Sequence, residues 1–281
     1  MLIGAPTLTS TPGRFPVLAE PVADSVLDGG TVGGLTVRAA SIRGDDHRFY
    51  GSPRQDAFAL WTAADSASAT PAMIASVADG VGSQPLSHLG AAAVGAHVQA
   101  ELQQHLGALL DAGAEHELSD RLHSVFAAVA DRLRVDARAH DVEPHLLSTT
   151  VVGAVFGWES AGSRRAVLFR VGDSLIFTLR GGTFEPAFVD GTQNVVLDTA
   201  TSALPLQVGP VEIGVATLAP GDVVVLCTDG LGIPLGTEPV ARQLADWWHA
   251  GPPDLAEFYW QLSFRAQTYG DDRTAVCVWV D

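Results

Sequence analysis

Aspartates lie at five places where a hydrophobic run meets a turn, each beside glycine or a second polar residue. Four of these places are the segments IASVADGVGS, LFRVGDSLIF, VVVLCTDGLG and YGDDRTAVCV, which contain Asp79, Asp173, Asp229 and the pair Asp271 and Asp272. A further aspartate, Asp56, opens the apolar run AFAL. A carboxylate at a strand end is fixed by the sheet and still reaches solvent. Several such carboxylates that converge on one spot repel each other unless a cation lies among them.

Oxygen ligands without nearby nitrogen or sulfur are the set that Mg²⁺ and Mn²⁺ prefer in proteins. A glycine after the aspartate lets the backbone approach closely, so that its carbonyl oxygen can serve as a further ligand. Any single Asp-Gly pair is more typical of an ordinary turn. The prediction of a divalent metal site therefore depends on the whole set and on its order.

Six segments follow one another in the order RQDAF, VADGVGS, STTVVGAVF, FRVGDS, VVLCTDGL and GDDRTAVCV. This series resembles the motifs of the metal-dependent serine/threonine phosphatases, the protein phosphatase 2C family, from about Leu35 to the C-terminus. The stretch HRFYGSPRQDAF, followed by ADGVGS and SHLGA, is most similar to a bacterial branch of that family. Each segment alone is a weak signal, but six in this order are specific.

The resemblance implies an α+β fold: a four-layer αββα sandwich of two antiparallel sheets flanked by helix pairs, with the metal site at one end. It also implies two Mn²⁺ or Mg²⁺ ions as cofactors. Asp79 would bridge the two ions, and the Gly80 carbonyl would bind one of them. Asp229 and Asp271 would complete the shell of the other ion, so that Asp79, Asp229 and Asp271 are the expected catalytic residues. Asp56 would act at the second ion.

The segment around Asp173 leaves two roles open, a ligand of a weaker third ion or a residue that only shapes a turn. Three departures from the family pattern concern the same site. Gln55 stands where many members have glutamate, and a neutral amide binds a divalent ion less strongly. Gly51 occupies the position of the usual phosphate-binding arginine. Val81 replaces a histidine that some members use to protonate the leaving group.

Three residues of the first loop are candidates for the missing phosphate ligand: Arg48, Arg54 and His47. A guanidinium group matches the geometry of phosphate oxygens, and a histidine beside it could donate a proton to the leaving oxygen. Arg48 together with His47 is the preferred pair, because a loop can approach the substrate from above the metals.

The reaction that the resemblance implies is hydrolysis of a phosphomonoester by a hydroxide that bridges the two ions. The expected substrate is a phosphorylated protein, and a cognate Ser/Thr kinase is a candidate partner. The alternative is a pseudo-phosphatase, or a regulatory binding module with this fold, whose metal and phosphate sites are weakened. The retained aspartates Asp79, Asp229 and Asp271 favour an enzyme.

Composition limits the remaining functions. The 281 residues carry 16 basic side chains, all arginine, against 32 acidic ones. A net charge of −16 repels a nucleic-acid backbone, so no nucleic-acid partner is expected. No apolar stretch is long enough for a membrane span, and the N-terminus does not resemble a signal peptide. The expected location is the cytoplasm, and the two cysteines are expected to be buried thiols.

The elements that must position the aspartates follow from hydrophobic periodicity. Residues 1–33, rich in Pro, Thr, Ser and Gly, are predicted to form an extended or mobile arm, and deletion through Pro12 is expected to leave the fold intact. Residues 34–281 form the predicted catalytic domain. Strands are expected at 35–43, 57–62, 73–78, 149–156, 166–171, 175–179, 211–218, 223–227 and 274–280. Helices are expected from near Ser87 through Leu109, around 118–133, and at 239–249 and 254–266. Gly172, Asp173 and Ser174 are interpreted as a tight hairpin turn.

Overall fold

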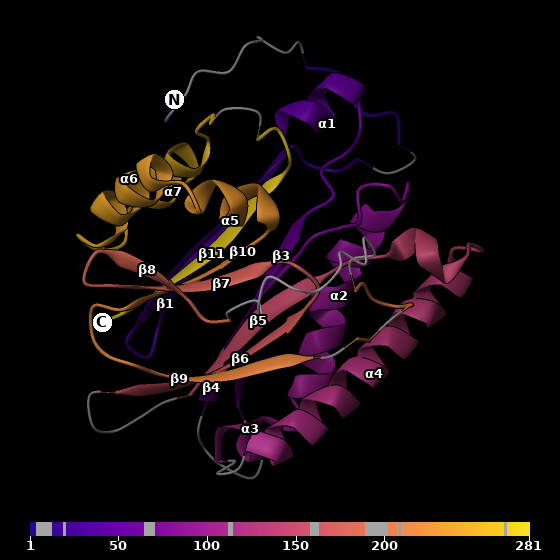
Figure 1. Ribbon diagram of the computed structural model, residues 1–281. Coiled ribbons are helices and arrows are strands. Elements are labelled where there is room, and N and C mark those ends of the chain that lie inside the picture. Colours follow the sequence, from indigo (N-terminus) through magenta and orange to yellow (C-terminus); the bar gives the residue numbers. More distant parts are fainter. Residues whose placement is uncertain are drawn as a thin grey trace, which may run out of the picture.

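The computed structural model describes residues 1–3, 13–18, 21–64, 71–111, 115–157, 163–188, 202–206, 208–209, 211–266 and 269–281. Within them, two antiparallel sheets pack face to face, and helices cover the outer face of each sheet (Figure 1). The four-layer arrangement that the sequence analysis predicted is therefore confirmed.

Every strand pair in the two sheets is antiparallel. The first sheet has the order β1 (Ser25–Val32), β2 (Leu35–Ile42), β11 (Arg273–Val280), β10 (Val223–Cys227), β7 (Leu175–Arg180), β8 (Thr183–Pro186). The second has the order β3 (Ala57–Ala64), β4 (Pro71–Ala78), β5 (Val151–Phe156), β6 (Arg164–Val171), β9 (Glu212–Leu218).

The helices divide into two groups that cover opposite faces (Figure 1). One group packs on the second sheet and comprises α2 (Ser87–Leu102), α3 (Leu106–Asp111) and α4 (Glu115–Ala139). The other packs on the first sheet and comprises α5 (Asp229–Leu235), α6 (Glu238–Trp248) and α7 (Leu255–Leu262). A short helix, α1 (Asp45–Tyr50), lies at one end of the sandwich, and a 3₁₀ turn spans Pro144–Leu147.

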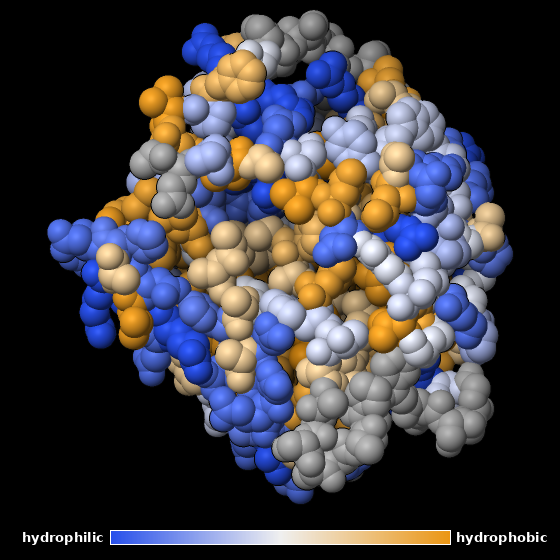
Figure 2. All heavy atoms as spheres, turned by 180° about the vertical axis from the view of Figure 1, so that it is seen from behind, coloured by the Kyte–Doolittle hydropathy of each residue, from blue (hydrophilic) through white to orange (hydrophobic). Residues whose placement is uncertain are grey.

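The core has three apolar layers, and the two-residue period of a strand divides its side chains between them. In β10, Val224 and Leu226 point between the two sheets, whereas Val225 and Cys227 point toward the helices α5–α7. Both cysteines are buried and unpaired with each other, as the sequence predicted. Seen from the opposite side, apolar residues gather in the middle of the face and hydrophilic ones surround them (Figure 2).

The hairpin predicted at Gly172, Asp173 and Ser174 is wrong. β6 pairs with β5 and β9 in the second sheet, whereas β7 pairs with β10 and β8 in the first. The three residues therefore cross from one sheet to the other. Gly172 has φ +102°, a backbone conformation that favours glycine. The long helix predicted through Leu109 is also interrupted, because α2 ends at Leu102 and α3 begins at Leu106.

The structure also revises the expected N-terminal arm. Ser25–Val32 form β1, which pairs with β2 over its whole length, so the folded domain begins before residue 34. Leu2 pairs with Arg265, and Ile3 is buried against the helices that cover the first sheet. Most of residues 4–20 fall outside the described part of the chain. Among the described helices, none has the length and apolar character needed to cross a membrane.

Candidate metal centre

The predicted aspartates come from strand ends of both sheets. Asp56 directly precedes β3 and Asp79 directly follows β4, and these two strands pair so that Ala57 faces Ala78. Asp229 begins α5 just after β10, and Asp271 lies just before β11 in the other sheet. β10 and β11 form an antiparallel pair, so that the end of β10 lies opposite the beginning of β11. The antiparallel order therefore places these carboxylates at one end of the sandwich.

Asp56 is held in the interior by hydroxyl groups. Its side chain is only 4% exposed, and its Oδ2 accepts a hydrogen bond of 2.8 Å from the Thr228 hydroxyl. Thr274 is a second hydroxyl partner. Burial raises the pKa of Asp56 well above its usual range, and the neighbouring Asp272 raises it further. Two hydroxyl donors do not offset this desolvation, so the carboxylate still lacks a compensating charge.

Asp79 is surrounded by other carboxylates. Burial raises its pKa well above the usual range, and Asp56, Asp229, Asp271 and Asp173 all add to the shift. The structure thus brings all five predicted aspartates within electrostatic reach of one another. The backbone of Asp79 is held by two hydrogen bonds. Its carbonyl oxygen accepts one from Thr149 Oγ1 at 2.9 Å and one from the Thr150 amide at 2.8 Å.

Asp229 has the same lack of compensating charge. Burial raises its pKa to about 6, and repulsion from Asp271 and Asp173 contributes. Its Oδ1 is buried without a hydrogen-bond partner among the described residues, and so is the Oε1 of Gln55. Buried oxygens are normally paired. Two such oxygens beside a group of mutually repelling carboxylates fit a divalent cation, because it supplies both the charge and the coordination that they lack.

Gly80 lies close to the backbone of two other segments. A side chain there would approach the carbonyl oxygens of Gln55 and Ser87 to 2.8 and 2.9 Å. Only glycine therefore fits between these two segments, which agrees with a close backbone approach. Asp173 is exposed in the crossing segment between β6 and β7, where it can face the carboxylate group without forming a hairpin turn.

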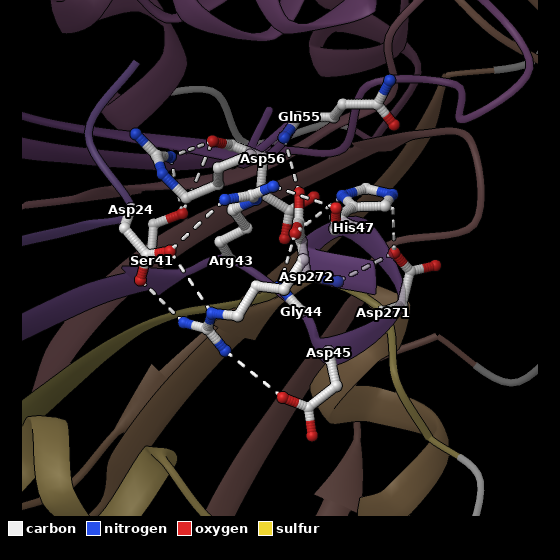
Figure 3. Close-up of polar contacts among 12 residues, drawn as sticks. Asp24, Ser41, Arg43, Gly44, Asp45, His47, Gln55, Asp56, Asp271 and Asp272 are labelled. Carbon is white, nitrogen blue, oxygen red and sulfur yellow. Dashed lines mark hydrogen bonds and ion pairs between the residues drawn. The ribbon is translucent and has the colours of Figure 1, made fainter. Parts of the chain in front are cut away.

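His47, on α1, points at the two aspartates that precede β11 (Figure 3). Its Nδ1 lies 2.8 Å from Asp272 Oδ1, and its Nε2 lies 3.7 Å from Asp271 Oδ1. Burial lowers the pKa of His47, but the charges of Asp272, Asp271 and Asp56 outweigh this effect and raise the pKa above its usual value. The three side chains offer ligand atoms that all lie within 4.8 Å of one another. His47 therefore borders the carboxylate group.

Asp272 is the residue that sequence reasoning missed. Its side chain is buried, and it accepts hydrogen bonds from the Gly44 amide at 2.7 Å and from the Gln55 amide at 2.5 Å. It thus ties both ends of the loop that carries α1 to the start of β11. The signal was present in the Asp-Asp pair, but the sequence does not say which of two neighbouring aspartates faces inward.

The two arginines proposed for the substrate phosphate have other partners. Arg54 is 9% exposed, and its guanidinium donates to the Ala23 carbonyl, to the Asp56 carbonyl and, at 2.7 Å, to Ser41 Oγ. Its position is that of a structural residue. Arg48 donates to Asp24 Oδ2 at 2.7 Å and lies 3.5 Å from Asp45 Oδ1. Its side chain is partly exposed, so Arg48 stays a candidate for anion binding whereas Arg54 does not.

The sequence profile of the family described as Protein phosphatase 2C matches residues 43–256. No curated protein sequence matches the chain.

Many solved structures share the fold, among them three bacterial ones. PppA, described as a key regulatory component of T6SS in Pseudomonas aeruginosa, is 20% identical with a TM-score of 0.54, and the match covers 88% of this chain and 98% of that one. The S. agalactiae serine/threonine phosphatase is 16% identical with a TM-score of 0.59, covering 88% and 100%. The catalytic domain of the phosphatase PstP, solved in complex with two manganese ions, is 21% identical with a TM-score of 0.54, covering 88% and 99%.

At these identities the structural matches establish the fold alone. The sequence profile goes further, because it spans about three quarters of the chain. It begins at the loop that carries His47 and includes Asp56, Asp79, Asp173 and Asp229. The chain belongs to the protein phosphatase 2C family.

Proposed function

We propose that the protein is a metal-dependent phosphatase that hydrolyses phosphoserine or phosphothreonine in proteins. The observation that carries this proposal is the group of buried, mutually repelling carboxylates at one end of the sandwich, with the unpartnered oxygen of Asp229. Burial and mutual repulsion raise the pKa values of these carboxylates, and a bound divalent cation would offset both effects. The manganese complex of PstP supports the same reading by analogy.

The residues that would hold the ions are Asp79, Asp229 and Asp271, with the Gly80 carbonyl and Asp56 at the second ion. Asp173 is the candidate for a weaker third ion. Bound Mn²⁺ or Mg²⁺ ions would lower the pKa of a water molecule that attacks phosphorus and would neutralise phosphoryl oxygens.

The other side chains prepare this site. Thr228 orients the Asp56 carboxylate through its hydroxyl group. Asp272 fixes the α1 loop through two backbone amides and so positions His47 beside Asp271. From that position His47 could hold or donate a proton at the leaving oxygen of the substrate.

A second function, binding without turnover, is favoured by one observation. Gly51 stands where the family usually has a phosphate-binding arginine. Arg54, a possible substitute, is buried and donates its hydrogen bonds to groups in the interior. A pseudo-phosphatase of this kind would bind Mn²⁺ and a phosphopeptide but would release no phosphate.

The test is phosphate release from a phosphothreonine peptide and from p-nitrophenyl phosphate. We expect turnover with Mn²⁺ or Mg²⁺ and none after EDTA treatment, with recovery when the metal is returned. Manganese binding without turnover on either compound would reject the enzyme and leave the binding module.

A further inference from the structure

A second site lies beside the candidate metal centre. A pocket of about 310 Å³ is enclosed by α1, the end of α7 and the loop before β11. Asp271 lines both the pocket and the carboxylate group, so the two sites share a wall. This volume is at the small end of the range for ligand pockets and suits one side chain or a small anion.

Positive charge is concentrated at this pocket. Four of the 16 basic residues of a strongly acidic chain line it: Arg43, Arg48, Arg265 and Arg273. Two of them, Arg43 and Arg273, are 4% and 6% exposed. Buried cations are costly unless carboxylates or other anions compensate them. These four arginines therefore need anions close to them.

Two carboxylates are shared among three of the arginines. Asp24 accepts a hydrogen bond from Arg48 at 2.7 Å. The Asp24 carboxylate also lies 3.8 Å from Arg43 (Figure 3). Asp45 lies 2.7 Å from Arg265 Nε and 3.5 Å from Arg48. Within the described residues, Asp24 and Asp45 are the carboxylates that lie within ion-pair distance of these four guanidinium groups. Asp272 attracts Arg43 only from a longer distance, and Asp45 does the same for Arg273.

Compensation is weakest at the two most buried arginines, Arg273 and Arg43. Within the described residues, Arg273 makes no ion pair, and its guanidinium donates to the carbonyl oxygens of Gly230, Leu262 and Phe264. Burial lowers its pKa only to about 10, so Arg273 remains charged at neutral pH. The Nε of Arg43 is buried with no hydrogen-bond partner in the described part of the chain. An unsatisfied donor and an unpaired buried cation in one small pocket are what an oxyanion would satisfy.

Asp271 does not supply the missing charge if the proposed metal centre is correct, because it is then a metal ligand. We propose that the pocket is an oxyanion subsite that accepts a carboxylate or phosphate group carried by the substrate chain close to the phosphorylated residue. This inference rests on the proposed function for the identity of the substrate, and it makes that substrate an acidic phosphoprotein segment. The shared wall at Asp271 places the subsite next to the reacting phosphate rather than at a remote surface.

Arg265 is the best residue with which to test the subsite. It is exposed at the mouth of the pocket, and it pairs with Asp45 from the end of α7. Arg242 is a matched control: it is an exposed arginine on α6, paired with Glu238 at 3.2 Å, and it does not line the pocket.

The first measurement is kinetic. With Mn²⁺, phosphothreonine peptides that carry Glu or phosphoserine at neighbouring positions should show a kcat/KM at least about fivefold higher than peptides with Gln there. The reason is that a charge-assisted hydrogen bond is stronger than a neutral one. The variant Arg265→Gln should bring this ratio close to one. Arg265→Lys should keep part of it, and Arg242→Gln should keep all of it.

The second measurement does not require turnover. Calorimetry with unphosphorylated peptides should show tighter binding of the Glu-flanked peptide than of its Gln-flanked counterpart, and Arg265→Gln should abolish the difference. Tighter binding of the Glu-flanked peptide without any turnover would support the subsite and reject the proposed enzymatic activity. Turnover without any preference for acidic peptides would reject the subsite and support the enzymatic activity. Binding of inorganic phosphate that depends on Arg265, with no peptide preference, would also overturn the assignment to the substrate chain.

Discussion

Asp271 and Asp272 are adjacent in the chain and have opposite environments. Asp271 is half exposed among other carboxylates, whereas Asp272 is buried and accepts two backbone amides. Asparagine at position 272 would offer an NH₂ group where a second acceptor is needed, so one buried amide would lose its partner. Asp272→Asn should therefore lower the free energy of unfolding in EDTA by about 2 kcal/mol.

Asp271→Asn should have the opposite effect under the same conditions. It removes one charge from a repelling group, so the metal-free protein should become more stable. Urea denaturation of both variants at neutral pH, with EDTA present, measures the difference. Equal destabilisation by the two substitutions would show that Asp271 also has a structural role.

Asp79 is the carboxylate with the most acidic neighbours in the site. If it bridges the two ions, Asp79→Asn should lower kcat by at least about a hundredfold and weaken Mn²⁺ binding, because the cations supply the nucleophile and the charge neutralisation. Asp246→Asn, an exposed change on α6, is the control and should leave both unchanged. Normal turnover by Asp79→Asn would remove this residue from the metal site.

At the scale of single residues, the sequence is most informative where chemistry and local structure coincide. Asp79 and Asp229 each follow a buried strand and precede glycine, and both reach the carboxylate group. Arg54 has the residue type for phosphate binding, but its environment is decided by Ser41 and Ala23, which lie on another strand and in the preceding segment. Such long-range contacts leave no signal in the local pattern.

At the scale of elements, strands with continuous apolar runs were predicted within a few residues of their observed bounds. β1 was missed because two glycines and several polar residues interrupt its pattern, and its partner β2 fixes it as a strand. α5 was missed because Gly230, Gly232 and Pro234 are poor helix formers. The segment between β6 and β7 has the composition of a tight turn, and composition does not reveal which sheet a strand joins.

Ile3 connects the N-terminal residues to the core. It is 7% exposed and packs in the layer between the first sheet and its helices. Deletion of the first twelve residues should therefore lower the free energy of unfolding by about 2 kcal/mol, the contribution of one buried aliphatic side chain. Thermal or urea denaturation of the truncated protein measures this effect.

The single variant Ile3→Ala separates the side chain from the rest of the segment. If it reproduces most of the loss, Ile3 is the contact that matters. If the truncation leaves stability unchanged, the original expectation of a dispensable arm is correct.

At the scale of the whole molecule, the raised pKa values couple stability to pH and to metal. The folded-state pKa of Asp229 is about 6, above its ordinary value of 3.8, so the folded protein binds protons more tightly than the unfolded chain. The stability that this provides is fully present below pH 3.8 and is lost as the pH rises through about 6. In EDTA, this group therefore destabilises the fold at neutral pH relative to acidic pH.

Mn²⁺ should restore the folding stability that is lost when the carboxylates ionise. We expect Mn²⁺ to raise Tm by several degrees at pH 7.5 and by much less at pH 5, because at pH 5 the ion must displace protons. Differential scanning fluorimetry with EDTA and with Mn²⁺ at both pH values tests this. A shift of the same size at the two pH values would mean that the stabilising ion binds elsewhere.

The two sheets contribute to the carboxylate group equally: Asp56 and Asp79 flank strands of one, and Asp229 and Asp271 flank strands of the other. These residues are also distributed from the first quarter of the chain to its last ten or so residues. The full carboxylate group therefore cannot assemble until β11 is in place. High contact order of this kind makes folding slow, and a divalent ion could meet the full set of carboxylates only after the two sheets have packed together. If the proposed metal centre is correct, metal binding would therefore report that the two sheets have closed on each other.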